Sequence, residues 1–548
     1  MSLQFDDIRR ALIGEGTAIP GPFGPRALIY ADYVASGRAL GFVEDAIRQH
    51  VLPYYGNTHT ETSFTGRRTT ELRELARASV REGMGADDGH AVVFCGAGST
   101  AATDKLVRAL QMGVPAGRLG PDAVVFVGPY EHHSNDLPWR ESGAKLVRIP
   151  LDAAGTLCLE TLKREIAAHA GAGLILGAFS AASNVTGIRT DIGAVARLLH
   201  EAGGWCVIDF AAAAPYVAIR LAESAPGAGD RIDAALISPH KFPGGPGASG
   251  LLIADCALLA AARPTVVGGG TVSFVSAAGQ CYIDGVEARE EAGTPSIVGN
   301  IRAGMVMALK TELGAEAIET REGELRARLD AALSAEPGIE LLGPRNAPRL
   351  GIFSFNIRIG ARHLHHGFVV AVLNDLFGIQ ARGGCSCAGP YGHHLLQIDD
   401  DRSQRFSEAV ARGHTAFRPG WVRLGVNYFF SDEDVDRLAR ALVFIARNGL
   451  ALLPLYRLDV EHGVWRALDG ARSPAPESLA ALWAETPETP EPPDFDTCLA
   501  EAARLAETGR ARADAVAGTP LHPEDEALRW FWLPEEAAAA LTDEETPA

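Results

Sequence analysis

Short apolar runs alternate with amphipathic stretches through the first half of the chain. Leu159 to Ala168 and Ile192 to Glu201 have helical spacing, and the runs around them have the length of buried strands. This repeated order of strand, turn and helix predicts a mostly parallel sheet with helices on both faces, and ligands of such sheets bind at the carboxyl ends of the strands. The expected strands are Ala91–Phe94, Ala123–Val127, Lys145–Ile149, Leu174–Phe179, Trp205–Asp209 and Ala234–Ile237.

The pattern changes near residue 300. A long helical segment from Ile301 to Leu333 predicts the connection to a smaller domain, which we expect to close with a helix at 432–447 capped by Ser431. The expected organisation is an N-terminal arm (1–25), a large domain (26–300), a small domain (301–450) and an acidic helical extension (451–548).

Composition narrows the functional classes. The 548 residues are 47% hydrophobic and 22% charged, as in ordinary globular proteins. No apolar run reaches the length of a membrane span and the N-terminus has no signal-peptide pattern, so we expect a cytoplasmic protein without a membrane partner. The eight cysteines have no spacing typical of a disulfide framework. A net charge of −18 argues against a nucleic-acid partner.

Much of this charge lies in the extension, where residues 451–548 hold 20 Asp and Glu against 7 Arg and no Lys. Proline and glutamate around Ser473–Pro476 and Thr486–Pro493 predict an extended linker. Trp530, Phe531 and Trp532 are the expected anchors, and we expect the extension to dock on the protein or on a second subunit rather than to recruit another protein.

Lys241 is the first candidate for chemistry. It follows the apolar run 234–237 in the segment Ser238-Pro239-His240-Lys241-Phe242-Pro243, so it is expected at a rigid strand end, with Ser238 and His240 as anion-binding neighbours. A crowded lysine loses its proton easily, and the neutral amine can form a Schiff base with an aldehyde. The alternative is a surface lysine in a turn.

Further polar clusters follow other expected strands. Gly96 to Thr100 can hold a phosphate with backbone N–H groups and hydroxyls at a helix start, or can be a plain tight turn. In Glu131–Asn135 a histidine can lie on an aromatic ring, or His132 and His133 can be a solvated pair. Asp209 can keep a pyridine nitrogen protonated, or can cap a turn.

In order and spacing, these clusters resemble the class V aminotransferase-fold enzymes that use pyridoxal 5′-phosphate, and among them the cysteine desulfurases and selenocysteine lyases. The likeness runs from about residue 28 to about 446. It implies an α/β fold-type-I transferase, whose large domain binds the cofactor and whose smaller domain is α+β. Lys241 would carry the cofactor, Asp209 would pair with its ring nitrogen and His132 would stack on its ring. The other implied contacts are Asn184 to cofactor and substrate, Ser99, Thr100, Ser238 and His240 to the phosphate, Thr294 to the phosphate of the other subunit of a homodimer, and Arg423 to the substrate carboxylate.

The segment Arg382-Gly383-Gly384-Cys385-Ser386-Cys387 resembles a segment of the second group of desulfurases. The resemblance places Arg382 at the substrate and makes Cys387 the nucleophile that takes the substrate sulfur as a persulfide. Molybdenum-cofactor sulfurases are similar in carrying a second cysteine where Cys385 lies. Two alternatives stay open: a zinc site with His393 and His394, or cysteines without a catalytic role.

Two residues depart from the family pattern: Ala212 stands where a glutamine usually contacts the cofactor, and Cys385 stands where the second group of desulfurases commonly has histidine. From the segment Arg382 to Cys387 we expect an enzyme that cleaves the C–S or C–Se bond of L-cysteine or selenocysteine to give alanine, with a sulfur-acceptor protein as partner. The alternative is a class V aminotransferase, or another lyase or epimerase, acting on an amino acid without a persulfide. A catalytically idle binding protein of the same fold is the third hypothesis.

Overall fold

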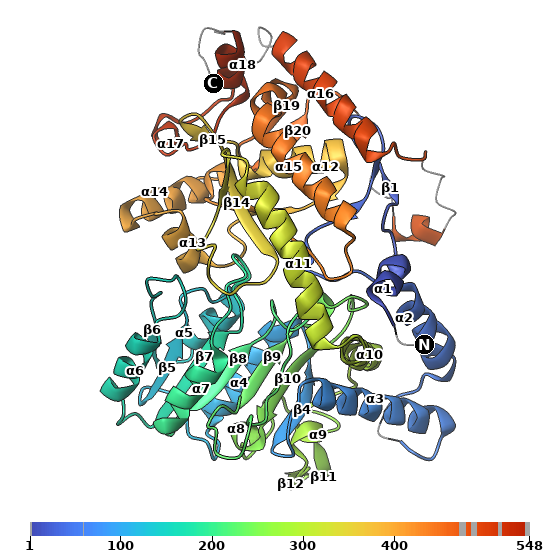
Figure 1. Cartoon of the computed structure of the whole chain (residues 1–548). Helices are drawn as coiled ribbons and strands as arrows, with labels where there is room; N and C mark the ends of the chain where they lie inside the picture. Colours follow the sequence, from blue (N-terminus) through green and yellow to red (C-terminus); the bar gives the residue numbers. More distant parts are fainter. Residues whose placement is uncertain (1–2, 59, 471–477, 484–489, 513–517, 543–548) are drawn as a thin grey trace. The chain divides into compact units, whose positions relative to one another are not determined.

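The computed structural model describes residues 3–58, 60–470, 478–483, 490–512 and 518–542. The chain forms two compact units (Figure 1). Unit 1 comprises residues 1–13, 33–323 and 344–350, and unit 2 comprises residues 14–32, 324–343 and 351–548. Residues 14–32, which the sequence pattern divided between the arm and the large domain, thus belong to unit 2. Much of the predicted linker lies outside the described residues, at 471–477 and 484–489.

A seven-stranded sheet forms the centre of unit 1, in the order β4-β10-β9-β8-β7-β5-β6. Its strands are β4 (His90–Cys95), β5 (Ala123–Val127), β6 (Lys145–Arg148), β7 (Leu174–Ser180), β8 (Trp205–Asp209), β9 (Ala234–Ile237) and β10 (Gly250–Asp255). All run parallel except β10, which is antiparallel to both of its neighbours. The α/β fold with a mostly parallel sheet is confirmed.

The strand β10 was missed from the sequence. Only twelve residues separate it from β9, with a short 3₁₀ turn but no α-helix between them, so the chain returns in the opposite direction. Hydrophobic residues of the sheet pack on α4 (Gly98–Met112), where Leu106 and Leu110 are fully buried. Helices α6 (Leu159–Ala168) and α7 (Ile192–Glu201) lie where the sequence predicts them.

Two helical segments are interrupted. The long segment after residue 300 is broken at Gly314, which has a φ of +82°, into α10 (Ile297–Leu313) and α11 (Ala315–Ser334). Residues 41–51 form α2 (Gly41–Ala46), which continues into a π-helical turn, η1 (Ile47–Val51). Helix α10 crosses α3 (Phe64–Gly83) closely, because a Cβ on Gly304 would lie 2.4 Å from the Cα of Ala76.

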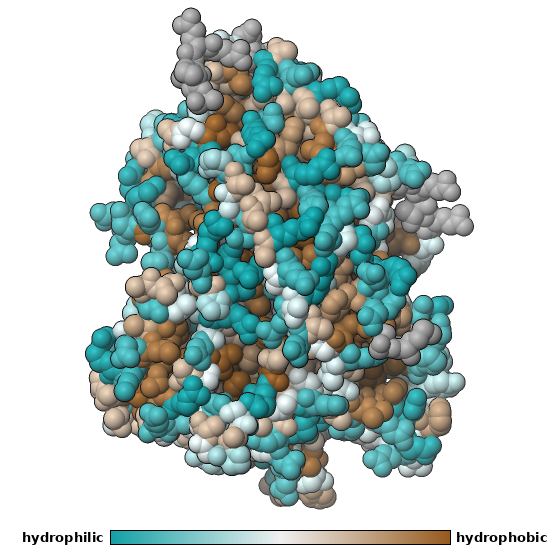
Figure 2. Space-filling model, in the orientation of Figure 1, coloured by the Kyte–Doolittle hydropathy of each residue, from teal (hydrophilic) through white to brown (hydrophobic). Residues whose placement is uncertain are grey.

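A hairpin of unit 1, β11 (Val272–Ser276) and β12 (Gly279–Tyr282), exposes apolar side chains. Phe274 is 65% exposed and Val275 61% exposed. Figure 2 shows hydrophobic residues where Figure 1 places this hairpin.

Unit 2 is built on a small antiparallel sheet in the order β13-β14-β18-β17. Its strands are β13 (Ile339–Leu341), β14 (Ile352–Ile359), β18 (Trp421–Gly425) and the edge strand β17 (Arg382–Gly384), with β15 (Arg362–His363) also on β14. Beside it, β16 (Ile379–Gln380) pairs in parallel with β3 (Ile29–Tyr30), and α12 (His366–Phe377) is largely buried.

Helix α15 (Asp432–Leu452) begins at a capping box in which Ser431 Oγ accepts from the N–H of Asp434, as the sequence predicts. With the turn that follows, it is the one described helix long and apolar enough to cross a membrane. However, 67% of the most apolar 18-residue stretch of this helix is buried, and the helix packs on α12 and on α16 (Phe495–Ala511). We therefore assign it as a core helix of unit 2.

The described part of the extension belongs to unit 2, and most of it packs there. It contains β19 (Tyr456–Asp459), β20 (Val464–Ala467), α16, α17 (Pro523–Glu526) and α18 (Pro534–Thr542). A Cβ on Gly509 of α16 would lie 1.9 Å from the carbonyl oxygen of Ala451, so glycine permits this close crossing of α15. The predicted docking is confirmed for these strands and helices, whereas residues 478–483 are exposed. The remaining helices and strands are α1 (Phe5–Ala11), β1 (Ala18–Ile19), β2 (Arg26–Ala27), α5 (Leu137–Arg140), α8 (Cys256–Leu259), α9 (Val286–Glu290), α13 (Gly389–Leu395) and α14 (Asp400–Ala411).

Candidate active site

Lys241 ends a short 3₁₀ turn, η4 (Pro239–Lys241), directly after β9. Its N–H donates to Ser238 O (3.0 Å). A second segment holds the turn, because the N–H of Gly37 donates to His240 O (2.8 Å) and a Cβ on Gly37 would lie 1.9 Å from Phe242 O. The backbone that carries the lysine is therefore fixed from both sides.

Asp209 ends β8, the strand beside β9, and is 4% exposed. Burial raises the pKa of its carboxyl group, whereas a hydrogen bond from the N–H of Ala211 (2.9 Å) and the positive charge of Lys241 act in the opposite direction. The structure thus places a buried carboxylate within electrostatic reach of the lysine amine.

Three of the predicted phosphate contacts meet at the start of α4. The N–H of Ser99 donates to Ser238 Oγ (2.9 Å). Gly98 has a φ of +55°, and a Cβ there would lie 2.6 Å from Ser238 Oγ and 2.8 Å from His240 Cε1. Only glycine fits this position, and the hydroxyl, the imidazole and the helix N-terminus together make a cradle for an anion.

His132 and Thr100 are joined through Ser134. The N–H of Ser134 donates to His132 Nδ1 (3.1 Å), and the hydroxyls of Ser134 and Thr100 are 2.7 Å apart. This contact connects the loop after β5 to the first turn of α4, next to the anion cradle.

Glu131, one residue before His132, holds this loop in place, a role that we did not assign from the sequence. Its carboxylate accepts from the N–H groups of Gly128 (3.2 Å) and Ser180 (2.9 Å), from Ser180 Oγ (2.6 Å) and from Asn135 Nδ2 (2.7 Å). Burial raises the pKa of Glu131 to about 7, and the nearby charge of Asp209 acts in the same direction. The only signal in the sequence is a glutamate in a polar cluster directly after a strand.

Asn184 and Thr294 have contrasting surroundings. Asn184 is 6% exposed, in a loop after β7 where Ser183 Oγ accepts from the N–H of Val185 (3.1 Å). Thr294 is exposed and accepts a hydrogen bond from Asn57 Nδ2 (3.4 Å). The segment before Thr294 is anchored by Glu291, which is buried and accepts from the N–H of Phe94 (2.7 Å) and from the guanidinium groups of Arg73 and Arg77.

In unit 2, Arg423 and Arg382 lie opposite each other on β18 and β17. Asp32 bridges them, since its carboxylate accepts from Arg423 Nη2 (3.1 Å) and from Arg382 Nε (2.9 Å). Arg423 is 4% exposed, and burial lowers its pKa although Asp32 opposes this shift. Asp32 was not singled out in the sequence, because it is 350 residues from Arg382.

The two cysteines of the candidate loop follow β17 directly. Ser386 and Cys387 have φ values of +53° and +55°, a left-handed conformation that is uncommon for residues with a side chain. The Cys387 residue is exposed and Cys385 is half-buried. Cys387 also lies within electrostatic reach of Arg423. The predicted nucleophile is thus held on an unusual backbone at the end of the strand pair that carries both arginines.

Comparison with known families and structures decides the class. The model of the aminotransferase class-V family matches residues 29–438. The chain belongs to this family. It is therefore an enzyme of a class that depends on pyridoxal phosphate.

Curated relatives agree with this membership. A "Probable cysteine desulfurase" of Halalkalibacterium halodurans is 28% identical over 420 residues, 76% of this chain and 92% of the relative. A "Probable cysteine desulfurase" of Pyrococcus abyssi is 29% identical over 369 residues, 66% of this chain and 86% of the relative. The apo structure of a cysteine desulfurase from Thermococcus onnurineus NA1 has a TM-score of 0.63 and 26% identity, and the match covers 77% of this chain and 95% of that one.

The class V site of unit 1 fits pyridoxal 5′-phosphate. The cradle at Gly98, which a Cβ would fill, offers donors suited to a phosphate, and Lys241 with the buried Asp209 suits an aldehyde on a protonated pyridine ring. Ala212, at the position where a glutamine is usual, is buried in the turn after β8.

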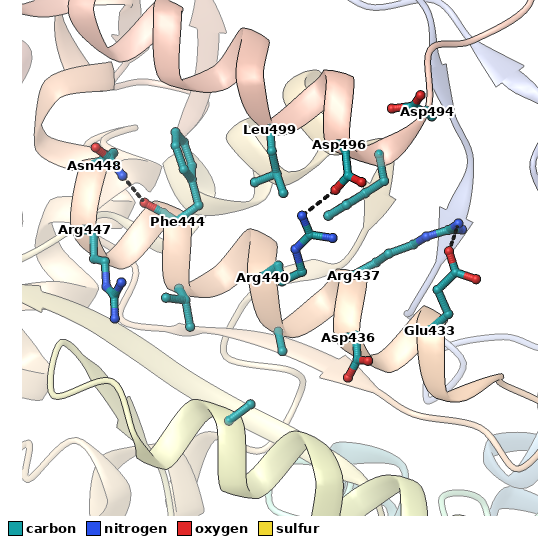
Figure 3. Close-up of a pocket in the computed structure, with 14 residues that line it drawn as sticks. Glu433, Asp436, Arg437, Arg440, Phe444, Arg447, Asn448, Asp494, Asp496 and Leu499 are labelled. Atoms are coloured by element: carbon teal, nitrogen blue, oxygen red, sulfur yellow. Dashed lines mark hydrogen bonds and ion pairs between the residues drawn. The ribbon is translucent and has the colours of Figure 1, made fainter.

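A groove elsewhere in unit 2 has a volume of 820 Å³ but contains none of the predicted site residues. It lies between α15 and the start of α16, with Phe444 and Leu499 as apolar lining and an ion pair between Arg440 and Asp496 (Figure 3). The part of the chain that the structure describes holds no group of three or more His, Cys, Asp or Glu residues arranged for a metal ion.

Proposed function

We propose that this class V enzyme is a cysteine desulfurase, which converts L-cysteine to L-alanine and leaves the sulfur on Cys387. Relatives named as cysteine desulfurases, aligned over most of their length, support the proposal. The observation that carries it in this chain is Cys387, exposed at the end of the strand pair that bears Arg382 and Arg423.

The cofactor, when bound, supplies a ring that stabilises negative charge at the substrate Cα. On this proposal Lys241 binds it and then moves the proton at the substrate Cα. Asp209 keeps the ring nitrogen protonated, and His132 packs on the ring. Asn184 contacts cofactor and substrate, and the cradle residues Ser99, Thr100, Ser238 and His240 bind the phosphate.

Arg423 binds the substrate carboxylate, for which the planar guanidinium is suited, and Arg382 adds positive charge beside it. The sulfur atom of Cys387 attacks the substrate sulfur, and the C–S bond breaks. L-cysteine and the Cys387 thiol thus give L-alanine and a Cys387 persulfide, and the reaction balances without any further oxidant or reductant.

The proposal includes a homodimer and a protein that accepts the sulfur. Thr294 is exposed and well anchored through Glu291, which suits a contact to the phosphate site of a second subunit. An acceptor thiol could attack the persulfide on Cys387, since this residue is exposed.

The test is incubation of the cofactor-loaded enzyme with L-cysteine and mass spectrometry of the tryptic peptide Gly383–Arg402. We expect one added sulfur atom on Cys387, and alanine in the solution. Cys387→Ser should form alanine at less than about 1% of the wild-type rate, as for the loss of a nucleophile. Cys281→Ser, which changes an exposed cysteine of unit 1, is the control and should be unaffected.

A class V aminotransferase is the second candidate, favoured by Ala212. It predicts a keto acid, no alanine from cysteine, and full activity in Cys387→Ser. These results would overturn the desulfurase proposal.

A further inference from the structure

Residues 530–532 of the extension are paired with β15 in parallel. The N–H of His363 donates to Trp530 O (3.1 Å), and the N–H of Trp532 donates to His363 O (3.0 Å). Phe531 between them is fully buried. Residues 530–532 therefore form part of the folded body of unit 2.

The Trp530 ring stacks on two histidines at the start of α12. Its centroid is 5.5 Å from that of His365, with an interplanar angle of 17°, and 5.8 Å from that of His366, with an angle of 28°. Burial places the pKa of His365 well below its ordinary value and lowers the pKa of His366 to about 4. Both rings are therefore neutral at pH 7 and suited to stacking.

His366 contacts the two strands that carry the sulfur chemistry. A Cβ on Gly383 of β17 would lie 3.0 Å from His366 Nδ1, and a Cβ on Gly420, just before β18, would lie 2.9 Å from His366 Nε2. One imidazole thus touches the strand that leads to Cys387 and the residue that leads into the strand of Arg423.

The strand β17 has few packing contacts of its own and is stabilised by the contact with His366. It is three residues long, lies at the edge of the sheet, and contains Gly383 and Gly384, which have no side chains to pack. The imidazole of His366 occupies the space that a side chain at Gly383 would otherwise fill. The left-handed residues Ser386 and Cys387 follow directly, so a shift of β17 would move them.

We propose that Trp530, acting through His366, is a positioning residue for the loop of Cys387. Its catalytic consequence rests on the proposed function, whereas its effect on the loop does not. The family match ends at residue 438, so this support comes from a part of the chain beyond the shared class V region.

The first test measures hydrogen–deuterium exchange of the full-length, cofactor-loaded protein. In Trp530→Ala we expect amides of residues 382–388 to exchange about three- to tenfold faster, as expected for the loss of one stacked aromatic pair. Trp530→Phe, which keeps an aromatic ring, should restore exchange close to wild type. Trp483→Ala is the matched control, since this tryptophan of the same extension is 86% exposed.

A double-mutant cycle tests whether Trp530 acts on the loop through His366. If Trp530 acts through His366, His366→Ala should accelerate exchange of the loop, and adding Trp530→Ala should accelerate it no further. In activity assays, Trp530→Ala should lower the yield of Cys387 persulfide while the visible absorbance of the bound cofactor stays unchanged.

Two results would overturn the inference. One is faster exchange of residues 362–365 in Trp530→Ala with unchanged exchange of residues 382–388, which would mean that the extension detaches without affecting the loop. The other is additive effects of the two substitutions. A wild-type enzyme that forms no persulfide would instead refute the proposed function. The effect of Trp530 on hydrogen exchange of the loop would still be tested by the exchange measurements alone.

Discussion

Lys241 in unit 1 and Cys387 in unit 2 carry the two halves of the proposed chemistry on different kinds of backbone. Lys241 follows an interior strand of a seven-stranded sheet, next to a buried carboxylate. Cys387 is exposed, on left-handed residues after a three-residue edge strand. A cofactor must be held in one orientation, whereas a persulfide must be delivered to an acceptor. A rigid strand end suits the first task and an exposed loop suits the second.

The largest effect on activity is expected at Lys241, on the rigid backbone of unit 1. Lys241→Ala should lower turnover by at least about a thousandfold, because in the proposed mechanism its amine both binds the cofactor and moves a proton. The visible absorbance of the covalently bound cofactor should also disappear. Lys145→Ala, on an exposed residue of β6, is the control. Retention of the absorbance in Lys241→Ala would show that another lysine binds the cofactor.

The sequence predicted the Lys241 half of the comparison more completely than the Cys387 half. The bounds of β5, β8 and β9 were predicted to the residue, since each is a continuous apolar run ended by a glycine, a proline or a polar residue. The role of Glu131, although it is adjacent to a predicted cluster residue, was missed because two of its four hydrogen bonds come from Ser180 and so depend on how β5 and β7 pair.

In unit 2 the sequence located the cysteine loop but not what supports it. Asp32 lies 350 residues from Arg382, and Trp530 lies well over a hundred residues after His366, so no local pattern indicates either contact. The left-handed conformation of Ser386 and Cys387 was also missed, because neither residue is a glycine.

The second prediction concerns Asp32, the carboxylate between the two arginines. Asp32→Ala should lower the free energy of unfolding by about 3 kcal/mol, because Arg423 would remain buried without this partner. The KM for L-cysteine should rise, since Arg423 would lose its orientation. Urea denaturation and steady-state kinetics measure the two effects, with Asp401→Ala, on an exposed residue of α14, as control. A variant with wild-type stability and KM would contradict the role of Asp32.

The third prediction returns to unit 1 and concerns pH. Burial raises the pKa of Glu131 from its ordinary value of 4.5 to about 7 in the folded protein. The folded state therefore binds this proton more tightly, and its stability should fall as the pH rises from 4.5 to 7, by up to about 3 kcal/mol.

Glu131→Gln removes this titration and places an amide donor among the donors that the carboxylate accepts, at a cost of about 1–3 kcal/mol. Its loss of stability relative to wild type should be larger at pH 5 than at pH 8. Thermal unfolding across this range measures it, with Glu160→Gln, on an exposed residue of α6, as control. An equal loss at both pH values would mean that Glu131 is ionised throughout.

The smallest effect is expected at Ser386, in the loop of unit 2. Glycine relieves a left-handed strain of about 1–2 kcal/mol but makes the unfolded chain more flexible, so Ser386→Gly should change the free energy of unfolding by less than about 1 kcal/mol. Gln397→Gly is the matched control, since Gln397 also has a positive φ (+52°) but lies ten residues beyond Cys387. Both variants should have similar stability by urea denaturation. Only Ser386→Gly should slow persulfide formation, because a glycine next to Cys387 allows the sulfur more orientations. If both variants transferred sulfur at the wild-type rate, the left-handed backbone would have no part in presenting Cys387, and the contrast with the rigid Lys241 site would be one of exposure alone.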